Sequence, residues 1–139
     1  MIRAELNQSI LRGGQRLSRQ DLDRTLSVCF LVMRKYPKTE LSIAFVTEHE
    51  MRRLNKQWRG NDRVTDVLSF ESGEVLICYQ QAKRQAIELK HSTRDEVIFL
   101  LVHGILHVYG YDHEKPSDAK KMFPLQTQIL TKLGIDPRI

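Results

Sequence analysis

Residues 92–110 of the chain read STRDEVIFLLVHGILHVYG, and this stretch decides the fold. Residues 92–93 are typical helix caps, and the acidic residues 95–96 follow in the first turn, where negative charge is favourable. Residues 97–102 are apolar on every side, which predicts a helix enclosed by other elements. Gly110 is suited to end that helix. We therefore expect a buried central helix around which the rest of the chain is arranged.

Two further helices are expected in the first half of the chain, each introduced by a capping box. Residues 18–21 begin the first helix, which Pro37 stops, and residues 47–50 begin the second. The buried face of the second helix is expected to consist of three residues: Met51, Leu54 and Trp58. Between the two helices, residues 40–46 alternate in polarity, which predicts a strand. Residues 59–66 are polar and are expected to form a loop.

The second half of the chain is expected to add strands and helices. Residues 67–70 and 75–78 are predicted to be two short strands. A helix is expected to begin near Tyr79, with three residues turned inward: Ala82, Ala86 and Leu89. A last helix is expected over residues 117–134, and Pro124 should kink it or mark a late start. Because strands and helices are mixed without strict alternation, the predicted fold class is α+β.

Length and composition limit the classes of protein to which the chain can belong. The chain has 139 residues, 41% hydrophobic and 28% charged, which is the size of one compact domain. No apolar run reaches the ~18 residues of a membrane helix, and no secretory signal is visible, so we expect a cytoplasmic protein. The net charge of +5 favours an anionic partner such as nucleic acid. Cys29 and Cys78 have apolar neighbours and are expected to be buried free thiols.

Three of the five histidines fall between residues 103 and 113. His103 and His107, four residues apart, project from one face of the predicted helix and can hold one Zn²⁺. Gly110 then lets the chain reverse, so that His113 can return as a third ligand. A buried histidine is more often a hydrogen-bonded core residue, but ligation removes a cost of about 1–3 kcal/mol per unpaired polar group. The remaining two are expected at the surface: His49 and His91.

Three nitrogen ligands leave a fourth position open, which is typical of a catalytic zinc site. The spacing is that of the zinc-peptidase pattern H-E-x-x-H-x-x-G-x-x-H. Here Gly104 replaces the glutamate that serves as the peptidase's general base. A bound metal can still polarise an oxygen or acidify a water, but the proton shuttle is missing. A zinc metallopeptidase is therefore the weaker alternative.

The sequence HGILH of residues 103–107, followed by GYDH of residues 110–113, resembles the signature of the YbeY-type endoribonucleases, which are bacterial rRNA maturation factors. A second block matches independently within residues 54–70, with WRG at residues 58–60 and TDVLSF at residues 65–70. Further matches lie in residues 73–86 and 122–130. The resemblance therefore spans nearly the whole chain.

This resemblance implies one α+β domain over residues 1–139, with a small mixed β-sheet. It implies one Zn²⁺ per chain, held by His103, His107 and His113, and a functional arginine at Arg59. The implied activity is single-strand-specific endonucleolytic cleavage, in 16S rRNA 3′-end maturation and ribosome quality control. The implied partners are ribosomal RNA, the small ribosomal subunit, an Era-type GTPase and a small-subunit ribosomal protein.

The chain departs from the family pattern at three places. The stretch from Phe70 to Gly73 is shorter than in most relatives and is expected to alter the rim of the substrate cleft. Glu74 follows Gly73 where an aspartate is usual, and Pro124 stands where an alanine is common. None of these changes affects an expected metal ligand.

Five basic residues fall within twelve positions and are expected to bind RNA: Arg52, Arg53, Lys56, Arg59 and Arg63. The alternatives are a solvated basic helix face and a patch that follows phosphates beside the metal. Asp62 is the acid among them. Arg59 leaves the helix end, and its planar guanidinium suits a phosphate bidentately. Asp66 is expected to cap or orient the loop.

The resulting hypothesis makes Arg59 and the three histidines catalytic. The metal acts as a Lewis acid or activates water, while Arg59 stabilises charge on the phosphate oxygens. Asp112 is expected to orient a histidine, and no carboxylate is an obvious base. Three aromatic residues are candidates for base stacking, against a default role in packing: Trp58, Tyr109 and Tyr111. The main alternative is a non-catalytic ribosome-assembly factor whose zinc is structural.

Overall fold

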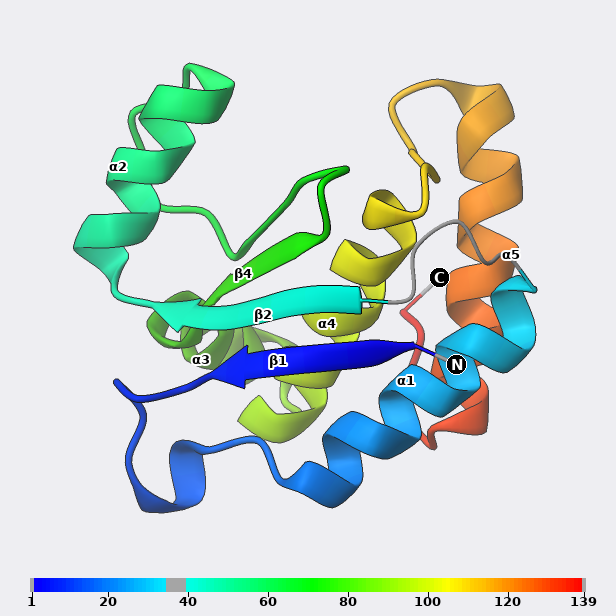
Figure 1. The fold of residues 1–139 in the computed structure, drawn as a ribbon, viewed down its shortest axis with the longest axis horizontal. Helices are drawn as coiled ribbons and strands as arrows, with labels where there is room; N and C mark the ends of the chain where they lie inside the picture. The colour runs from blue at the N-terminus through cyan, green and yellow to red at the C-terminus, as the bar shows by residue number, and fades with distance from the viewer. Residues whose placement is uncertain (1, 35–39, 139) are drawn as a thin grey trace.

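The computed structural model describes residues 2–34 and 40–138. Its elements are β1 (Arg3–Asn7), the short 3-10 helix η1 (Gly13–Gln15), α1 (Arg19–Met33), β2 (Glu40–Val46), α2 (Glu48–Arg59), β3 (Val67–Ser69), β4 (Glu74–Cys78), α3 (Tyr79–Leu89), α4 (Thr93–Val108) and α5 (Pro116–Lys132). The α+β class is confirmed (Figure 1). Pro37, the expected end of the first helix, lies outside the described residues. Helix α5 continues through Pro124, so the late start of this helix is wrong.

The four strands form one mixed sheet in the order β1-β2-β4-β3. Strands β1, β2 and β4 are parallel neighbours, whereas β3 pairs antiparallel with β4. The sequence pattern does not predict β1, because its five residues carry only two apolar side chains, Ala4 and Leu6, which pack against the core. The mixed sheet implied by the family resemblance is therefore confirmed, with one additional edge strand.

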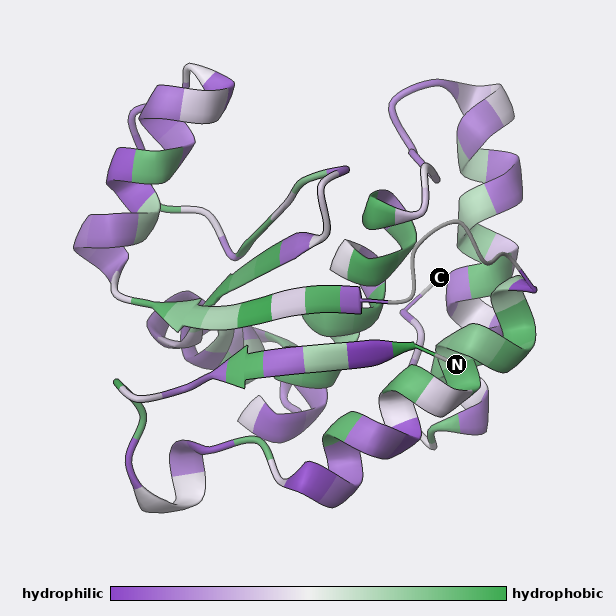
Figure 2. Cartoon of the chain, in the orientation of Figure 1, coloured by the Kyte–Doolittle hydropathy of each residue, from purple (hydrophilic) through white to green (hydrophobic). Residues whose placement is uncertain are grey.

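Helix α4 lies against one face of the sheet and is enclosed on its other sides by α1, α3 and α5 (Figure 1). Residues 97, 98, 100–102, 104–106 and 108 of α4 are all buried, as its uniformly apolar sequence predicts. In Figure 2 the part of α4 behind the sheet is mainly hydrophobic, whereas α2 is mainly hydrophilic. None of the described helices is long and apolar enough to span a bilayer.

Helix α2 covers part of the opposite face of the sheet. Met51 of α2 packs with Leu68 of β3 and Cys78 of β4 in a small second core. The C-terminal end of α2 projects beyond the sheet (Figure 1), so Trp58 is 57% exposed and its expected burial is wrong. Leu89, at the end of α3, is likewise exposed. Cys29 and Cys78 are buried free thiols, as expected.

Gly104 marks the close approach of α4 to the sheet. A Cβ atom at this position would lie 2.8 Å from Cγ1 of Val75 and 3.3 Å from Cγ2 of Val67. Val75 is fully buried, so it has little room to move away. Position 104 therefore has no space for a side chain, and the glutamate of the peptidase pattern cannot be accommodated there.

We predict that Gly104→Ala lowers the free energy of unfolding by about 1–3 kcal/mol, because the added methyl group forces α4 away from β4. Urea denaturation followed by circular dichroism measures this change. Gly14→Ala is the matched control, since a Cβ at Gly14 meets no atom within 4 Å. Equal stability of the two variants would contradict the close contact.

Candidate functional site

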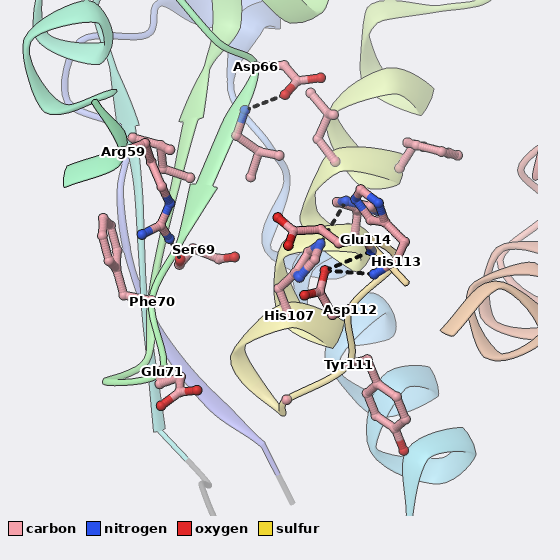
Figure 3. A pocket seen from close by; sticks show the side chains of 16 residues that line it. Arg59, Asp66, Ser69, Phe70, Glu71, His107, Tyr111, Asp112, His113 and Glu114 are labelled. Carbon is pink, nitrogen blue, oxygen red and sulfur yellow. Dashed lines mark hydrogen bonds between the residues drawn. The ribbon is translucent and has the colours of Figure 1, made fainter. Parts of the chain in front are cut away.

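Three histidines converge beside the C-terminal end of α4. His103 and His107 both belong to the helix, and His113 approaches His107 from the following loop (Figure 3). One ring nitrogen from each histidine lies within 4.8 Å of the other two, and the Nε2 atoms of His103 and His107 are 3.0 Å apart. The structure thus brings together the three predicted ligands in a cluster that can hold a metal ion.

The loop that carries His113 is shaped by the end of α4. Gly110 has a φ of +92°, a conformation that favours glycine, and the Tyr111 amide donates to the Leu106 carbonyl. The Asp112 carboxylate accepts from the backbone amide of His113 at 2.7 Å. Asp112 therefore orients the third histidine through its backbone rather than through its imidazole.

Burial and one hydrogen bond prepare the two helical histidines for a metal. Nδ1 of His103 lies 2.8 Å from Oε1 of Gln126, a buried residue of α5, which leaves Nε2 facing the cluster. Burial lowers the pKa of His103 and lowers that of His107 to about 4, so both rings are neutral near pH 7. Neutral imidazoles offer the lone pairs that a metal requires. The sequence analysis does not single out Gln126. It could have been noticed as a polar residue on the helix face that also carries the apolar Met122 and Ile129.

The histidines line one side of an open pocket of about 820 Å³, and Arg59 lines the other (Figure 3). Arg59 is the last residue of α2, and its Nη2 donates to the Ser69 carbonyl at 2.8 Å. Its guanidinium carbon lies 5.0 Å from the centre of the Phe70 ring. The end of β3 therefore holds Arg59 facing the candidate metal site.

The other four basic residues of the predicted RNA-binding patch do not line this pocket. Arg52 pairs with Asp62 at 2.8 Å and Arg53 pairs with Glu50 at 2.6 Å. The two remaining residues are exposed and form no ion pair with any described residue: Lys56 and Arg63. Two of the five positive charges are therefore neutralised by neighbouring carboxylates, so the patch is less positive than five clustered basic residues indicate.

Comparison with known proteins identifies the family. Residues 12–134 match the family model described as Endoribonuclease YbeY. The chain belongs to the Endoribonuclease YbeY family. A relative from Limosilactobacillus fermentum, named Endoribonuclease YbeY, is 41% identical over 119 residues, which cover 70% of this chain and 76% of the relative. Another from Sulfurihydrogenibium sp., with the same name, is 47% identical over 106 residues, or 68% and 70% of the two chains.

The solution structure of TM1509 from Thermotoga maritima is also similar to this chain. The two share 28% sequence identity with a TM-score of 0.61, and the match covers 96% of this chain and 91% of TM1509. The similarity therefore extends beyond the motif residues of the YbeY family to nearly the whole chain.

In this YbeY family member, Asp66, at the end of the loop that it is expected to cap or orient, orients the start of β3. Its Oδ1 accepts from the Val67 amide at 2.7 Å, and its Oδ2 accepts from Nε2 of Gln85 at 3.2 Å. The same Gln85 nitrogen donates to Glu96 at 2.8 Å. A hydrogen-bonded chain therefore connects the pocket wall to the interior beneath α3.

Glu96 is fully buried at the centre of this network. The sequence indicates only a favourable negative charge in the first turn of the helix. Besides Gln85, Glu96 contacts Nε2 of His91 at 2.8 Å and Nη1 of Arg138 at 2.8 Å. The His91 side chain is only 16% exposed, so its expected surface position is wrong, whereas His49 is exposed. The guanidinium of Arg138 lies 3.5 Å from the centre of the ring of Phe99, which lines the pocket.

The structure also brings to the pocket two carboxylates that the sequence does not single out. Glu71 lies in the turn between β3 and β4, and Glu114 follows the third histidine (Figure 3). Neither has a local sequence signal, because each reaches the pocket through the path of its loop. Among the aromatic candidates, Tyr111 lines the pocket and Tyr109 is buried in the core.

We predict that the purified protein binds one divalent metal ion and that His107→Ala lowers both metal content and Tm. Binding to the folded state alone adds to its stability, so the Tm difference between metal-loaded and chelated protein should shrink in the variant. Elemental analysis and thermal denaturation measure the two effects, with His49→Ala as the exposed-histidine control. Unchanged metal content in His107→Ala would exclude the histidine cluster as the site.

We predict that Glu96→Ala lowers the free energy of unfolding by about 1–3 kcal/mol, because it leaves the Arg138 guanidinium without its carboxylate and removes one of the two acceptors of the Gln85 amide. Chemical denaturation gives the value, and Glu88→Ala, at an exposed position of α3, is the control. A loss below about 1 kcal/mol would show that the network does not hold these elements together.

Proposed function

We propose that this chain is a zinc-dependent endoribonuclease that cuts single-stranded RNA. The observation that carries the proposal is the placement of the histidine cluster and the Arg59 guanidinium on opposite sides of one open pocket. A phosphodiester is an anion with several oxygens, and it can contact both sides at once. The names of the YbeY relatives favour RNA over a peptide as the substrate.

The donor set suits zinc. Three imidazole nitrogens, from His103, His107 and His113, would hold the ion and leave a position open towards the pocket. When bound, zinc would polarise a phosphoryl oxygen or lower the pKa of a water molecule. The hydrogen bond from His103 to Gln126 would keep the first ligand oriented.

Arg59 is the residue of this chain that is prepared to stabilise negative charge on the phosphate. A guanidinium has five N–H donors, and one of those of Arg59 is used on the Ser69 carbonyl. Unlike Arg52 and Arg53, Arg59 has no acidic partner among the described residues. Its charge is therefore available to a substrate, and its position is set before the substrate arrives.

Two carboxylates are placed to move a proton. Glu71 and Glu114 both line the pocket, and each can accept a proton from an attacking hydroxyl group or water molecule. Asp66 and Asp112 also line it, but one oxygen of each, Oδ1, accepts backbone hydrogen bonds that shape β3 and the histidine loop. The two exposed glutamates have no such structural role, so we assign proton transfer to them.

We further propose, from the family resemblance, that the substrate is ribosomal RNA of the small subunit. The reaction would be 16S rRNA 3′-end maturation, with a second role in ribosome quality control in the cytoplasm. The proposed partners are the small ribosomal subunit, an Era-type GTPase and a small-subunit ribosomal protein. These assignments rest on the resemblance and not on the shape of the pocket.

We predict that Arg59→Ala lowers the rate of RNA cleavage about 100-fold or more, because it removes the preorganised charge opposite the metal. The measurement is cleavage of a labelled rRNA precursor by zinc-loaded protein. Arg59→Lys should recover only part of the rate, since it keeps the charge but loses the planar fork. Arg52→Ala, whose guanidinium is already paired with Asp62, is the matched control and should stay near wild type.

The same assay distinguishes the rival functions. Unchanged cleavage by Arg59→Ala would exclude its catalytic role. A zinc-loaded wild-type protein that binds ribosomal RNA but never cuts it would instead indicate an assembly factor with a structural zinc. Peptide hydrolysis that chelation abolishes and zinc restores would indicate a peptidase, although Gly104 leaves no room for the usual base.

A further inference from the structure

Trp58 is an exposed indole at the end of α2, beside the pocket. It is the only tryptophan of the chain and is 57% exposed, although the helical spacing predicts a buried residue. Its ring meets the Phe70 ring edge-on, with centroids 6.1 Å apart and an interplanar angle of 75°. The indole is therefore held by one aromatic neighbour while much of its surface faces solvent.

This aromatic pair continues directly into the pocket. Phe70 lines the pocket, and the guanidinium of Arg59 lies 5.0 Å from the centre of its ring. Trp58, Phe70 and Arg59 thus form one continuous surface, which we call the Trp58 platform. It extends from the outside of α2 to the group that faces the candidate metal site.

The backbone makes this platform rigid. The Phe70 amide donates to the Glu74 carbonyl at 2.9 Å, and the Phe70 carbonyl accepts from the Gly73 amide at 2.9 Å. Residues 70–73 therefore form a tight turn. Arg59 is tied to the neighbouring Ser69 carbonyl. A rigid aromatic surface binds a planar group with little loss of conformational entropy.

We infer that the Trp58 platform is a stacking subsite for an unpaired base adjacent to the phosphate that Arg59 contacts. The inference rests on the proposed function and deepens it, because it supplies a reason for single-strand selectivity. A base within a duplex is already stacked on both faces, whereas an unpaired base can stack on an exposed aromatic ring.

The surroundings of Trp58 favour RNA over a protein partner. Arg59, which has no acidic partner among the described residues, lies against the same Phe70 ring that Trp58 contacts. Trp58 is also the single exposed large hydrophobic residue described in α2, so it does not belong to a broad apolar patch. An exposed aromatic ring beside a guanidinium that has no acidic partner is typical of single-strand binding.

Fluorescence of the sole tryptophan tests the inference directly. Zinc-loaded protein is titrated with a single-stranded 2′-O-methyl oligoribonucleotide, with the same oligonucleotide in a duplex, and with versions that lack one base at successive positions. We expect the single strand to quench Trp58 and the duplex to leave it unchanged. One abasic position should abolish the quenching and raise the Kd, measured by anisotropy of the labelled strand, by about the same factor as removal of the indole.

Variants give the second measurement. Trp58→Leu should raise the Kd for the single strand about tenfold, whereas Trp58→Phe should stay within about threefold of wild type. Ile87→Ala is the matched control, because Ile87 is 68% exposed on α3 and does not line the pocket. Metal content and Tm of each variant, compared with wild type, show that the fold and the histidine cluster are intact.

The inference fails if Trp58→Leu binds the single strand as tightly as wild type, or if the duplex quenches Trp58 equally. It also fails if Trp58→Leu loses affinity only for the small ribosomal subunit, which would indicate a protein contact. In each of these cases wild-type cleavage of RNA can persist, so the proposed function is judged separately. A zinc-loaded wild-type protein that neither binds nor cuts RNA contradicts both.

Discussion

The close contact between Gly104 of α4 and Val75 of β4 is the constraint on which the site depends. This contact lets α4 lie directly on the sheet, with Gly104, the residue after His103, turned towards β4. Successive helical residues point about 100° apart, so His103 can face the pocket only because its neighbour faces the sheet. The same contact that builds the metal cluster therefore excludes the peptidase's glutamate. Chemistry at this cluster has to take its other groups from the opposite side of the pocket.

The opposite side is held by polar contacts rather than by apolar packing. Asp66 holds the start of β3, and Gln85 connects it to the buried Glu96. Glu96 lies on α4, the helix that also carries His103 and His107, so one element supports both sides. A buried carboxylate with several donors has little freedom to move, because each displacement leaves a charged group unsatisfied. This arrangement connects the β3 wall of the pocket to α4.

Much of the fold could be predicted because its signals are local. The caps at Ser18, Thr47 and Ser92 all accept the expected amide hydrogen bonds, and the three histidines form the cluster that their spacing predicts. The misses depend on residues distant in sequence. Glu96 can be buried because Gln85 and Arg138 form hydrogen bonds with it, and Trp58 is exposed because the end of α2 extends beyond the sheet (Figure 1). Neither fact can be predicted from the periodicity of the sequence.

The basic residues show the same difference between what the composition indicates and where the side chains lie. The excess of +5 favours a polyanionic partner, but two of the five clustered basic residues are paired with acids. What distinguishes Arg59 is not a stronger local field but a fixed position, between the Ser69 carbonyl and the Phe70 ring. Phosphate contacts position a nucleic acid without reading its state, so one arginine cannot separate single strands from duplexes. That selection has to come from a group that contacts the bases, and the ring on which Arg59 lies also supports the exposed Trp58.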